Sequence, residues 1–348
     1  MGENYQLEPL NSEEIGRWDE LTAAFPNREL FHRKVWLDYL RDSRGVDIRY
    51  WAIRNGEERI GYFCGGILRK GPFRILGSPL KGWGTNFLGP VASASFRTEP
   101  FLSALDRLAS LEKIAMAEFE SSTVPGEDLE SAGYEPVPDS TFFVTLTPGD
   151  TDGVWKTIES TCRNRIRKAM KAGLTIEDTH DPAVADQFYD QYSDLMRRKG
   201  LVPPYPREYP KKLLKHLKAA NLIFALRVRN AEGQVLATGL FPHDERTMYF
   251  WGGASWEEGR ELCPNEFLHW SAIRMATESG LQLYNTCGTG QFKRKFGGEY
   301  KVTRRWHKCY GQTARWARKG YEVYFKNRIR LRGWWENVSR RRGGGVAQ

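Results

Sequence analysis

Residues 246–284, RTMYFWGGASWEEGRELCPNEFLHWSAIRMATESGLQLY, decide the fold. The first part of this stretch predicts a strand that ends in the pair Gly252-Gly253. Pro264 then opens a helix and Gly280 lies just beyond its end, which is where these two residue types favour helix termini. The closing LQLY predicts the next strand. The chain therefore runs from a strand with a glycine break, through a helix that packs on the sheet, into a second strand.

This order offers two features that could bind a ligand. A glycine pair can leave a strand edge unpaired, so that an extended pantetheine or peptidyl chain could bond to it like an added strand. The free N–H groups at the start of the helix suit a pyrophosphate, and Arg260 lies just ahead of them. Glycine pairs also occur at ordinary strand bends, and the sequence leaves that alternative open.

Two hairpins of the same plan lie far apart in the chain. Residues 48–68 contain two β-rich runs joined by Asn-Gly, and residues 222–241 contain two more, with Asn230 and Gly233 in the turn. A helical stretch precedes each hairpin. We therefore expect an α/β protein with two lobes of related construction.

The length of 348 residues agrees with two core-bearing domains. A strand-like run ends just before Pro148, and we place the boundary there. This gives an N-terminal lobe of residues 1–150, a C-terminal lobe of residues 151–312 and a tail of residues 313–348.

The composition narrows the class of protein. No apolar run approaches the roughly 20 residues that a membrane span needs, and the N-terminus lacks a basic region followed by an apolar one. These features predict a cytoplasmic protein. The five cysteines are scattered and show no C-x-x-C spacing, so we expect neither a disulfide framework nor a metal site.

The tail carries most of the net charge. Residues 313–348 contain ten Lys or Arg and two Glu, and therefore account for eight of the nine net positive charges. Aromatic residues are interleaved with these cations. This composition suits an anionic membrane surface or a phosphate backbone, and would hold the protein at the inner face of the membrane. The alternative is a helix whose aromatic side chains pack on the body while its arginines stay solvated.

Several segments together resemble the FemAB-like branch of the GNAT acyltransferase superfamily, which includes peptidoglycan-bridge aminoacyltransferases and CelD-like (BioF2-like) acetyltransferases. The resemblance covers roughly residues 25–312. It rests on LFHRKVWLDYL, CRNRIRKAMKAGL, YSDLMRRKGLVPPYPREY, ELCPNEFLHWSAIRMATESGLQLY and above all FKRKFGG. It implies two tandem GNAT-like lobes, each a mixed central sheet flanked by helices. The acyl donor would bind in the second lobe, and the acceptor along the groove between the lobes. The usual phosphate loop of GNAT proteins is absent before Pro264.

The resemblance assigns a catalytic role to Lys293, because FKRKFGG matches the family pattern Phe-Lys-x-x-Phe/Trp-Gly. The matching lysine stabilises negative charge in the transfer reaction. A fixed ammonium group in a partly dry cleft does this far better than one in water. Asn285 stands where the family usually has Asp, and an amide cannot act as a general base near neutral pH. Glu299 as base and Tyr300 as proton donor are the nearest replacements in the sequence, although both also suit an ordinary loop.

The remaining candidate residues fall into two groups. We expect five residues to bind the donor: Trp251, Gly252, Gly253, Arg260 and Asn265. We expect three residues to contact the acceptor: Arg198, Tyr205 and Asn285.

The resemblance implies an acyltransferase that moves an acetyl or other acyl group from acyl-CoA, its co-substrate, to an amine or hydroxyl of a sugar-containing or lipid-linked envelope precursor. Two alternatives remain. The donor could be aminoacyl-tRNA, although no long coiled-coil insertion of the kind found in peptidoglycan-bridge enzymes appears in the second lobe. The protein could also be a degenerate transferase that acts as a membrane or RNA scaffold.

Overall fold

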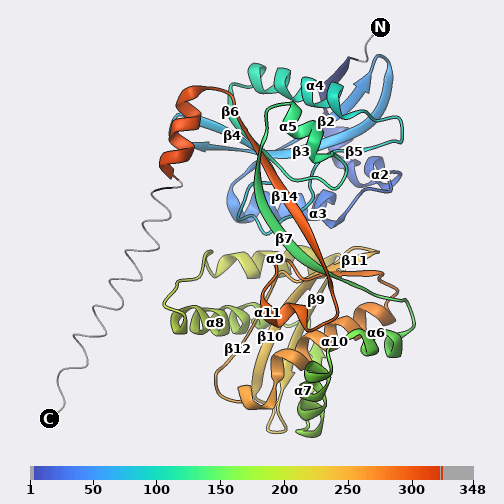
Figure 1. Cartoon of the computed structure of the whole chain (residues 1–348), viewed down its shortest axis with the longest axis vertical. Coiled ribbons are helices and arrows are strands. Elements are labelled where there is room, and N and C mark those ends of the chain that lie inside the picture. Colours follow the sequence, from blue (N-terminus) through green and yellow to red (C-terminus); the bar gives the residue numbers. More distant parts are fainter. Residues whose placement is uncertain (1–3, 322, 324–348) are drawn as a thin grey trace, which may run out of the picture.

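The computed structural model describes residues 4–321 and 323 of the chain. It has two lobes stacked along the long axis of the molecule (Figure 1). The first lobe contains helices α1 (Ser12–Gly16), α2 (Trp18–Ala23), α3 (Lys34–Arg44), α4 (Thr98–Leu111) and α5 (Gly126–Ser131), the short η1 (Leu30–His32), and strands β1 (Tyr5–Pro9), β2 (Asp47–Asn55), β3 (Glu58–Lys70), β4 (Phe73–Ser78), β5 (Val91–Ala92) and β6 (Ile114–Phe119).

The second lobe repeats the pattern of hairpin, strand, helix and strand. It contains helices α6 (Thr151–Thr157), α7 (Ser160–Lys171), α8 (Ala183–Arg198), α9 (Glu208–Ala219), α10 (Pro264–Glu278) and α11 (Gln291–Arg294), the short η2 (Arg260–Leu262), and strands β8 (Thr175–Asp178), β9 (Ile223–Arg229), β10 (Val235–Pro242), β11 (Thr247–Tyr249), β12 (Gly252–Ser255) and β13 (Leu283–Asn285). Both predicted hairpins are present, as β2–β3 and β9–β10. The expected fold class is therefore confirmed.

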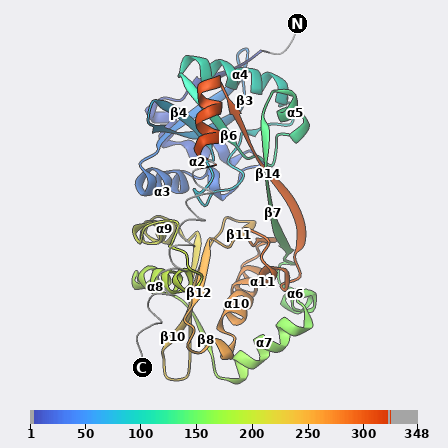
Figure 2. The ribbon, with the colours of Figure 1, turned by 60° about the vertical axis from the view of Figure 1, so that its left-hand side comes forward.

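Two long strands connect the lobes. β7 (Glu135–Thr145) and β14 (Glu299–Cys309) pair antiparallel from Phe143 opposite Glu299 to Glu135 opposite His307. β14 also pairs with β6 in the first lobe, and β7 with β13 in the second. Figure 2 shows the two strands running along one side of the molecule from one lobe to the other. The domain boundaries remain a prediction, because the last strand of the chain contributes to both lobes.

The strands form two sheets. The larger has the order β1-β2-β3-β4-β6-β14-β7-β13-β11, with β5 paired to β3, and the smaller has the order β12-β10-β9-β8. The sequence predicted residues 246–255 as one strand ending in glycines. That prediction was wrong, because β11 belongs to the larger sheet, whereas the glycines open β12 in the smaller one.

The lobes also share an apolar core on the side away from β7 and β14. One continuous cluster of buried side chains includes Trp36 and Leu40 of α3 with Phe188 of α8 and Leu213 of α9. Burial of apolar surface across this seam holds the lobes in a fixed relative position.

The start of the basic tail is a helix over residues 312–321 that lies against the first lobe (Figure 1). Its inner side includes the buried Ala314, whereas Trp316 is 72% exposed. Lys70 on β3 lies over the Tyr321 ring, with its ammonium nitrogen 4.9 Å from the ring centroid. The other tail residues on which the membrane prediction depends, 322 and 324–348, lie outside the described residues.

Candidate functional site

The two sheets separate at residues 250–252. β11 runs parallel to β13, with Tyr249 opposite Asn285, and the Phe250 N–H donates a last hydrogen bond of 2.9 Å to the Asn285 carbonyl. The Trp251 N–H then bonds instead to the Leu240 carbonyl on β10 at 3.2 Å. Beyond this point β12 is the outer strand of its sheet, and no other strand of the described chain pairs with its far edge. An extended chain could bond to that edge.

The glycine pair at the start of β12 is needed for close packing. A methyl group on Gly252 would lie 2.8 Å from the Phe188 ring, and one on Gly253 would lie 2.9 Å from the Phe250 ring. The ring of Trp251, which directly precedes the two glycines, lies 5.1 Å, centroid to centroid, from that of Tyr205. Its indole N–H is buried without a partner among the described residues. Tilted aromatic rings therefore line one side of the opening, the gap that forms where β12 separates from β13.

A cavity of about 330 Å³ lies at the start of α10. Its lining consists of Arg165, Arg260, Pro264, Asn265, Glu266, Gln291, Phe292 and Lys295. No side chain caps the helix start, so its first N–H groups remain available. Three of the lining side chains are cationic. The one carboxylate, Glu266, accepts a hydrogen bond of 3.0 Å from Arg165. The cavity therefore has the charge and the backbone donors of an anion site.

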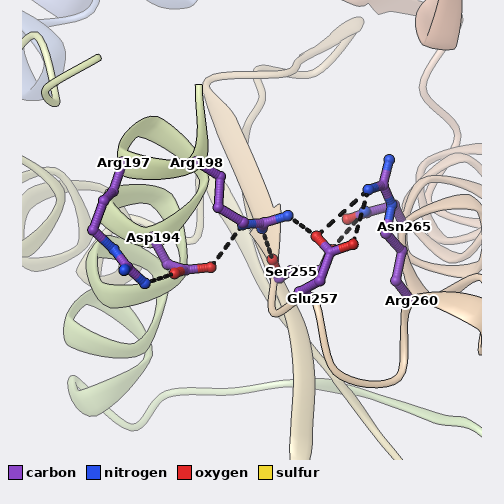
Figure 3. A network of polar contacts seen from close by, with 7 residues as sticks. All are labelled: Asp194, Arg197, Arg198, Ser255, Glu257, Arg260 and Asn265. Carbon is purple, nitrogen blue, oxygen red and sulfur yellow. Dashed lines mark hydrogen bonds and ion pairs between the residues drawn. The ribbon is translucent and has the colours of Figure 1, made fainter. Parts of the chain in front are cut away.

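Three predicted site residues meet in one polar network at the outer end of β12 (Figure 3). Arg198 bonds to Asp194 at 2.9 Å and also contacts Glu257. Glu257 accepts a hydrogen bond of 3.2 Å from Arg260. The Asn265 amide donates to the Ser255 hydroxyl at 2.8 Å. Arg198, which we expected to contact the acceptor, is thus brought to the expected donor residues Arg260 and Asn265.

Lys293 lies on α11, above the point where the sheets separate. Its ammonium group donates to the Cys287 carbonyl at 2.9 Å and lies 5.1 Å from the centroid of the Phe250 ring. Desolvation by burial lowers its pKa. Beneath it, Phe296 is fully buried and stacks on His269 at 5.0 Å. The lysine is therefore held next to the opening by a rigid aromatic base.

Asn285 is fully buried and serves the local backbone. Its side-chain oxygen accepts hydrogen bonds from the Thr141 hydroxyl at 2.7 Å and the Cys287 N–H at 2.8 Å. These bonds fix the turn after β13, in which Cys287 adopts a left-handed conformation with φ of 51°. The Asn285 side-chain nitrogen is buried without a hydrogen-bond partner among the described residues, and its contact with an acceptor stays a prediction.

Glu299 and Tyr300 lie at the start of β14. Glu299 is exposed and its nearest cation is Lys301, at 3.8 Å. Tyr300 is 56% exposed and packs its ring edge against Phe142. The described contacts do not join either residue to Lys293, so their catalytic roles remain predictions without support from position.

Sequence reasoning missed several residues of the first lobe that reach this region. The Asn86 amide donates to the Cys287 sulfur at 3.7 Å, and Glu29 accepts a hydrogen bond of 2.9 Å from the Tyr249 hydroxyl. Arg305 of β14 pairs with the buried Glu120 at 2.5 Å. No local pattern marks these residues, because they meet only when the lobes pack together. Among the described residues no group of His, Cys, Asp or Glu is arranged to hold a metal ion.

Comparisons with known proteins agree with this geometry. Residues 158–302 match the family model of the acetyltransferase (GNAT) domain. Among solved structures, FemX has a TM-score of 0.70 at 16% identity, over 88% of this chain and 98% of its own. A tandem GNAT protein from the clavulanic acid biosynthesis pathway has a TM-score of 0.56 at 11% identity, over 88% of this chain and 98% of its own.

A third similar structure is the C-terminal domain of a putative lysylphosphatidylglycerol synthetase from Agrobacterium fabrum. It has a TM-score of 0.58 at 14% identity, over 90% of this chain and 97% of its own. A comparison with curated proteins finds no match. Residues 158–302 thus match the model of the acetyltransferase (GNAT) domain, and the whole chain is similar in its two-lobe fold to FemX.

Proposed function

We propose that the protein transfers an acyl group, in the simplest case acetyl, from acyl-CoA to an amine or hydroxyl of a cell-envelope or exopolysaccharide precursor. The observation that carries this proposal is the opening between β12 and β13, with an unpaired strand edge inside it and a cationic cavity at its mouth. A pantetheine arm needs the first feature, and a pyrophosphate needs the second.

In this proposal the donor extends along β12 with its phosphates at the start of α10. Arg260 and Lys295 supply positive charge there, and the Asn265 N–H lies in the first turn of the helix. The thioester then reaches the point where the sheets separate. Lys293 stabilises the charge that develops on the carbonyl oxygen, because it is a partly dehydrated cation held in place.

Calorimetric titration with acetyl-CoA, and in parallel with free CoA, tests the donor. We expect micromolar binding of both ligands. Replacing Arg260 with alanine should weaken binding about 10- to 100-fold, because one charge-assisted hydrogen bond contributes roughly 1.5–3 kcal/mol. Arg274→Ala is the matched control, since Arg274 lies on α10, whose start lines the cavity, but pairs with Glu278 near the far end of that helix. Equal weakening by both variants would argue against the assigned phosphate site.

The alternative donor, aminoacyl-tRNA, is favoured by one feature of α7. This helix carries five Lys or Arg and no acidic residue, and its Arg165 reaches the cavity. A row of cations of this kind fits a polyphosphate strand as well as a single nucleotide. Absence of binding to both acetyl-CoA and CoA would favour this donor, or the non-catalytic scaffold.

We further propose that the tail holds the enzyme at an anionic membrane surface. No helix among the described residues combines the length and apolarity that a bilayer crossing requires. Trp316 is exposed on the helix over residues 312–321 and lies between the exposed cations Arg315 and Lys319. An aromatic ring flanked by cations suits the interface of an anionic bilayer.

Sedimentation with phosphatidylglycerol-containing vesicles tests the role of the tail. We expect the full chain to sediment with these vesicles and not with purely zwitterionic ones, and binding to fall at high salt. Removal of residues 313–348 should abolish the association. If the truncated chain still sediments with anionic vesicles, another surface is responsible.

A further inference from the structure

Glu29 of the first lobe lies against the strand that opens the candidate site. It directly precedes η1 and faces β11 of the second lobe. One carboxylate oxygen accepts a hydrogen bond of 2.9 Å from the Tyr249 hydroxyl, and the other accepts one of 3.1 Å from Ser122. Tyr249 is the last residue of β11, immediately before the sheets separate. A carboxylate of one lobe is thus positioned by the strand end of the other.

A few residues at the end of β11 and after β13 connect Glu29 to Lys293. Tyr249 is followed by Phe250, whose ring lies 5.1 Å from the Lys293 ammonium nitrogen. Lys293 also bonds to the Cys287 carbonyl, and Cys287 is close enough to Tyr249 to affect its charge state. Tyr249 packs in the cluster shared with the first lobe, whereas Phe250 packs against the cluster of the second lobe. Glu29 and Lys293 therefore approach the end of β11 from opposite faces, one from each lobe.

Glu29 differs from the other carboxylates in this seam. Asp244 accepts hydrogen bonds from the backbone N–H groups of Leu30 and Thr247, at 2.8 and 2.6 Å. Glu120 pairs with Arg305. Among the described residues Glu29 accepts hydrogen bonds from neutral donors alone, the Tyr249 and Ser122 hydroxyls and a backbone N–H of η1, and it has no salt bridge. Asp244 and Glu120 add negative charge nearby. The Glu29 carboxylate therefore has no cationic partner among the described residues.

Glu29 is also both accessible and dehydrated. Its side chain is half-buried rather than sealed, yet desolvation raises its pKa to about 7, against the opposing effect of the hydrogen bonds from Tyr249 and Ser122. Glu29 thus keeps partial exposure although it is largely desolvated at the seam between the lobes. His32, the nearest base on the same segment, is fully buried and stays neutral, because desolvation lowers its pKa to about 4.

We propose that Glu29 binds the ammonium group of the acceptor and takes one proton from it, so that the acceptor is a primary amine. This inference rests on the proposed acyl transfer and narrows its acceptor from an amine or hydroxyl to an amine. A carboxylate with no cation partner fits an ammonium group, whereas a hydroxyl would leave the charge uncompensated.

The protons balance as follows. The ammonium group gives one proton to the Glu29 carboxylate, and the neutral amine nitrogen attacks the thioester carbonyl carbon. The tetrahedral intermediate, its oxygen facing Lys293, then breaks the carbon–sulfur bond. The nitrogen loses a second proton to the departing thiolate. Glu29 later releases its proton to water. The products are an amide, CoA and one proton.

Nuclear magnetic resonance of the protein with isotope-labelled glutamate carboxyl carbons tests this directly, and the Glu29 signal is identified by its loss in Glu29→Gln. Methylammonium, in large excess, serves as the amine probe and methanol as the uncharged control. We expect methylammonium to lower the midpoint of the Glu29 titration by about one pH unit or more, because an opposite charge at hydrogen-bond distance favours the carboxylate. Methanol should leave it unchanged. A Glu29 titration that is the same with and without methylammonium would overturn the inference.

Acetyl-CoA binding, measured on the same samples, separates this inference from the proposed function. Glu29→Gln should bind acetyl-CoA as tightly as the wild-type chain. If the wild type binds no acetyl-CoA but Glu29 responds to methylammonium, the amine site stands and the donor is wrong. The reverse result leaves the donor intact and removes the amine site. Tyr249→Phe supports the assignment of the signal, because loss of its hydrogen bond should move the Glu29 titration to higher pH.

Discussion

Replacing Lys293 with alanine is expected to lower kcat about 10²- to 10³-fold while leaving acetyl-CoA affinity nearly unchanged. The reason lies in when the ammonium group acts. Within the described part of the chain it bonds to the Cys287 carbonyl and lies over Phe250, so it is held in place and partly dehydrated before any substrate binds. Its charge then gains most from the negative oxygen of the tetrahedral intermediate. Steady-state kinetics combined with donor titration would measure the two effects separately.

Arg294→Ala is the matched control for Lys293. It removes a cation from the next residue of the same short helix, but Arg294 is exposed and its nearest partner is Glu159, at 3.6 Å. We expect less than a twofold change in kcat. Comparable losses in both variants would mean that general positive charge, and not the position of Lys293, matters. If the protein is a scaffold instead, its binding to partners should be unchanged in Lys293→Ala.

The sequence predicts most of the local elements correctly. Asn-Gly and Asn-x-x-Gly turns mark both hairpins, and Pro264 and Gly280 bracket α10 to within a residue or two. These signals are local, so they are available before the chain folds. The split of residues 247–255 between two sheets is not local, because it depends on which strands pair with β11 and β12. The passage of β14 through both lobes depends on tertiary pairing in the same way.

The residues of the candidate site also differ in whether local sequence or tertiary packing brings them together. Resemblance identified Lys293 and the start of α10, because those residues occur in contiguous motifs. Glu29 was missed, since it is joined to Tyr249 across 220 positions of sequence. Asn285 was assigned to the acceptor from its place in a motif. Its side-chain oxygen bonds to Thr141 and to the turn after β13, whereas its side-chain nitrogen has no partner among the described residues. A motif can show that a position matters, whereas only the packing shows which groups the side chain contacts.

Replacing Gly297 with alanine is expected to destabilise the protein by about 2–5 kcal/mol, the sum of backbone strain and overpacking. Gly297 has a φ of 79°, and a methyl group there would lie 2.5 Å from the backbone carbonyl oxygen of Thr157, at the end of α6. A backbone atom cannot move aside as a flexible side chain can. The neighbouring Phe296 would be pulled from His269, and with it the support under Lys293.

Urea unfolding measures the loss in Gly297→Ala as a lower midpoint, and Gly290→Ala in the same loop is its control. Gly290 has a φ of −59° and open space where its methyl group would lie, so alanine there should change the free energy of unfolding by less than about 1 kcal/mol. Kinetics of the folded Gly297→Ala fraction would then show whether the strain reaches the site. If the variant is destabilised but retains full kcat, the loop anchors the fold without positioning Lys293. If the variant also loses kcat, Gly297 is needed to position Lys293.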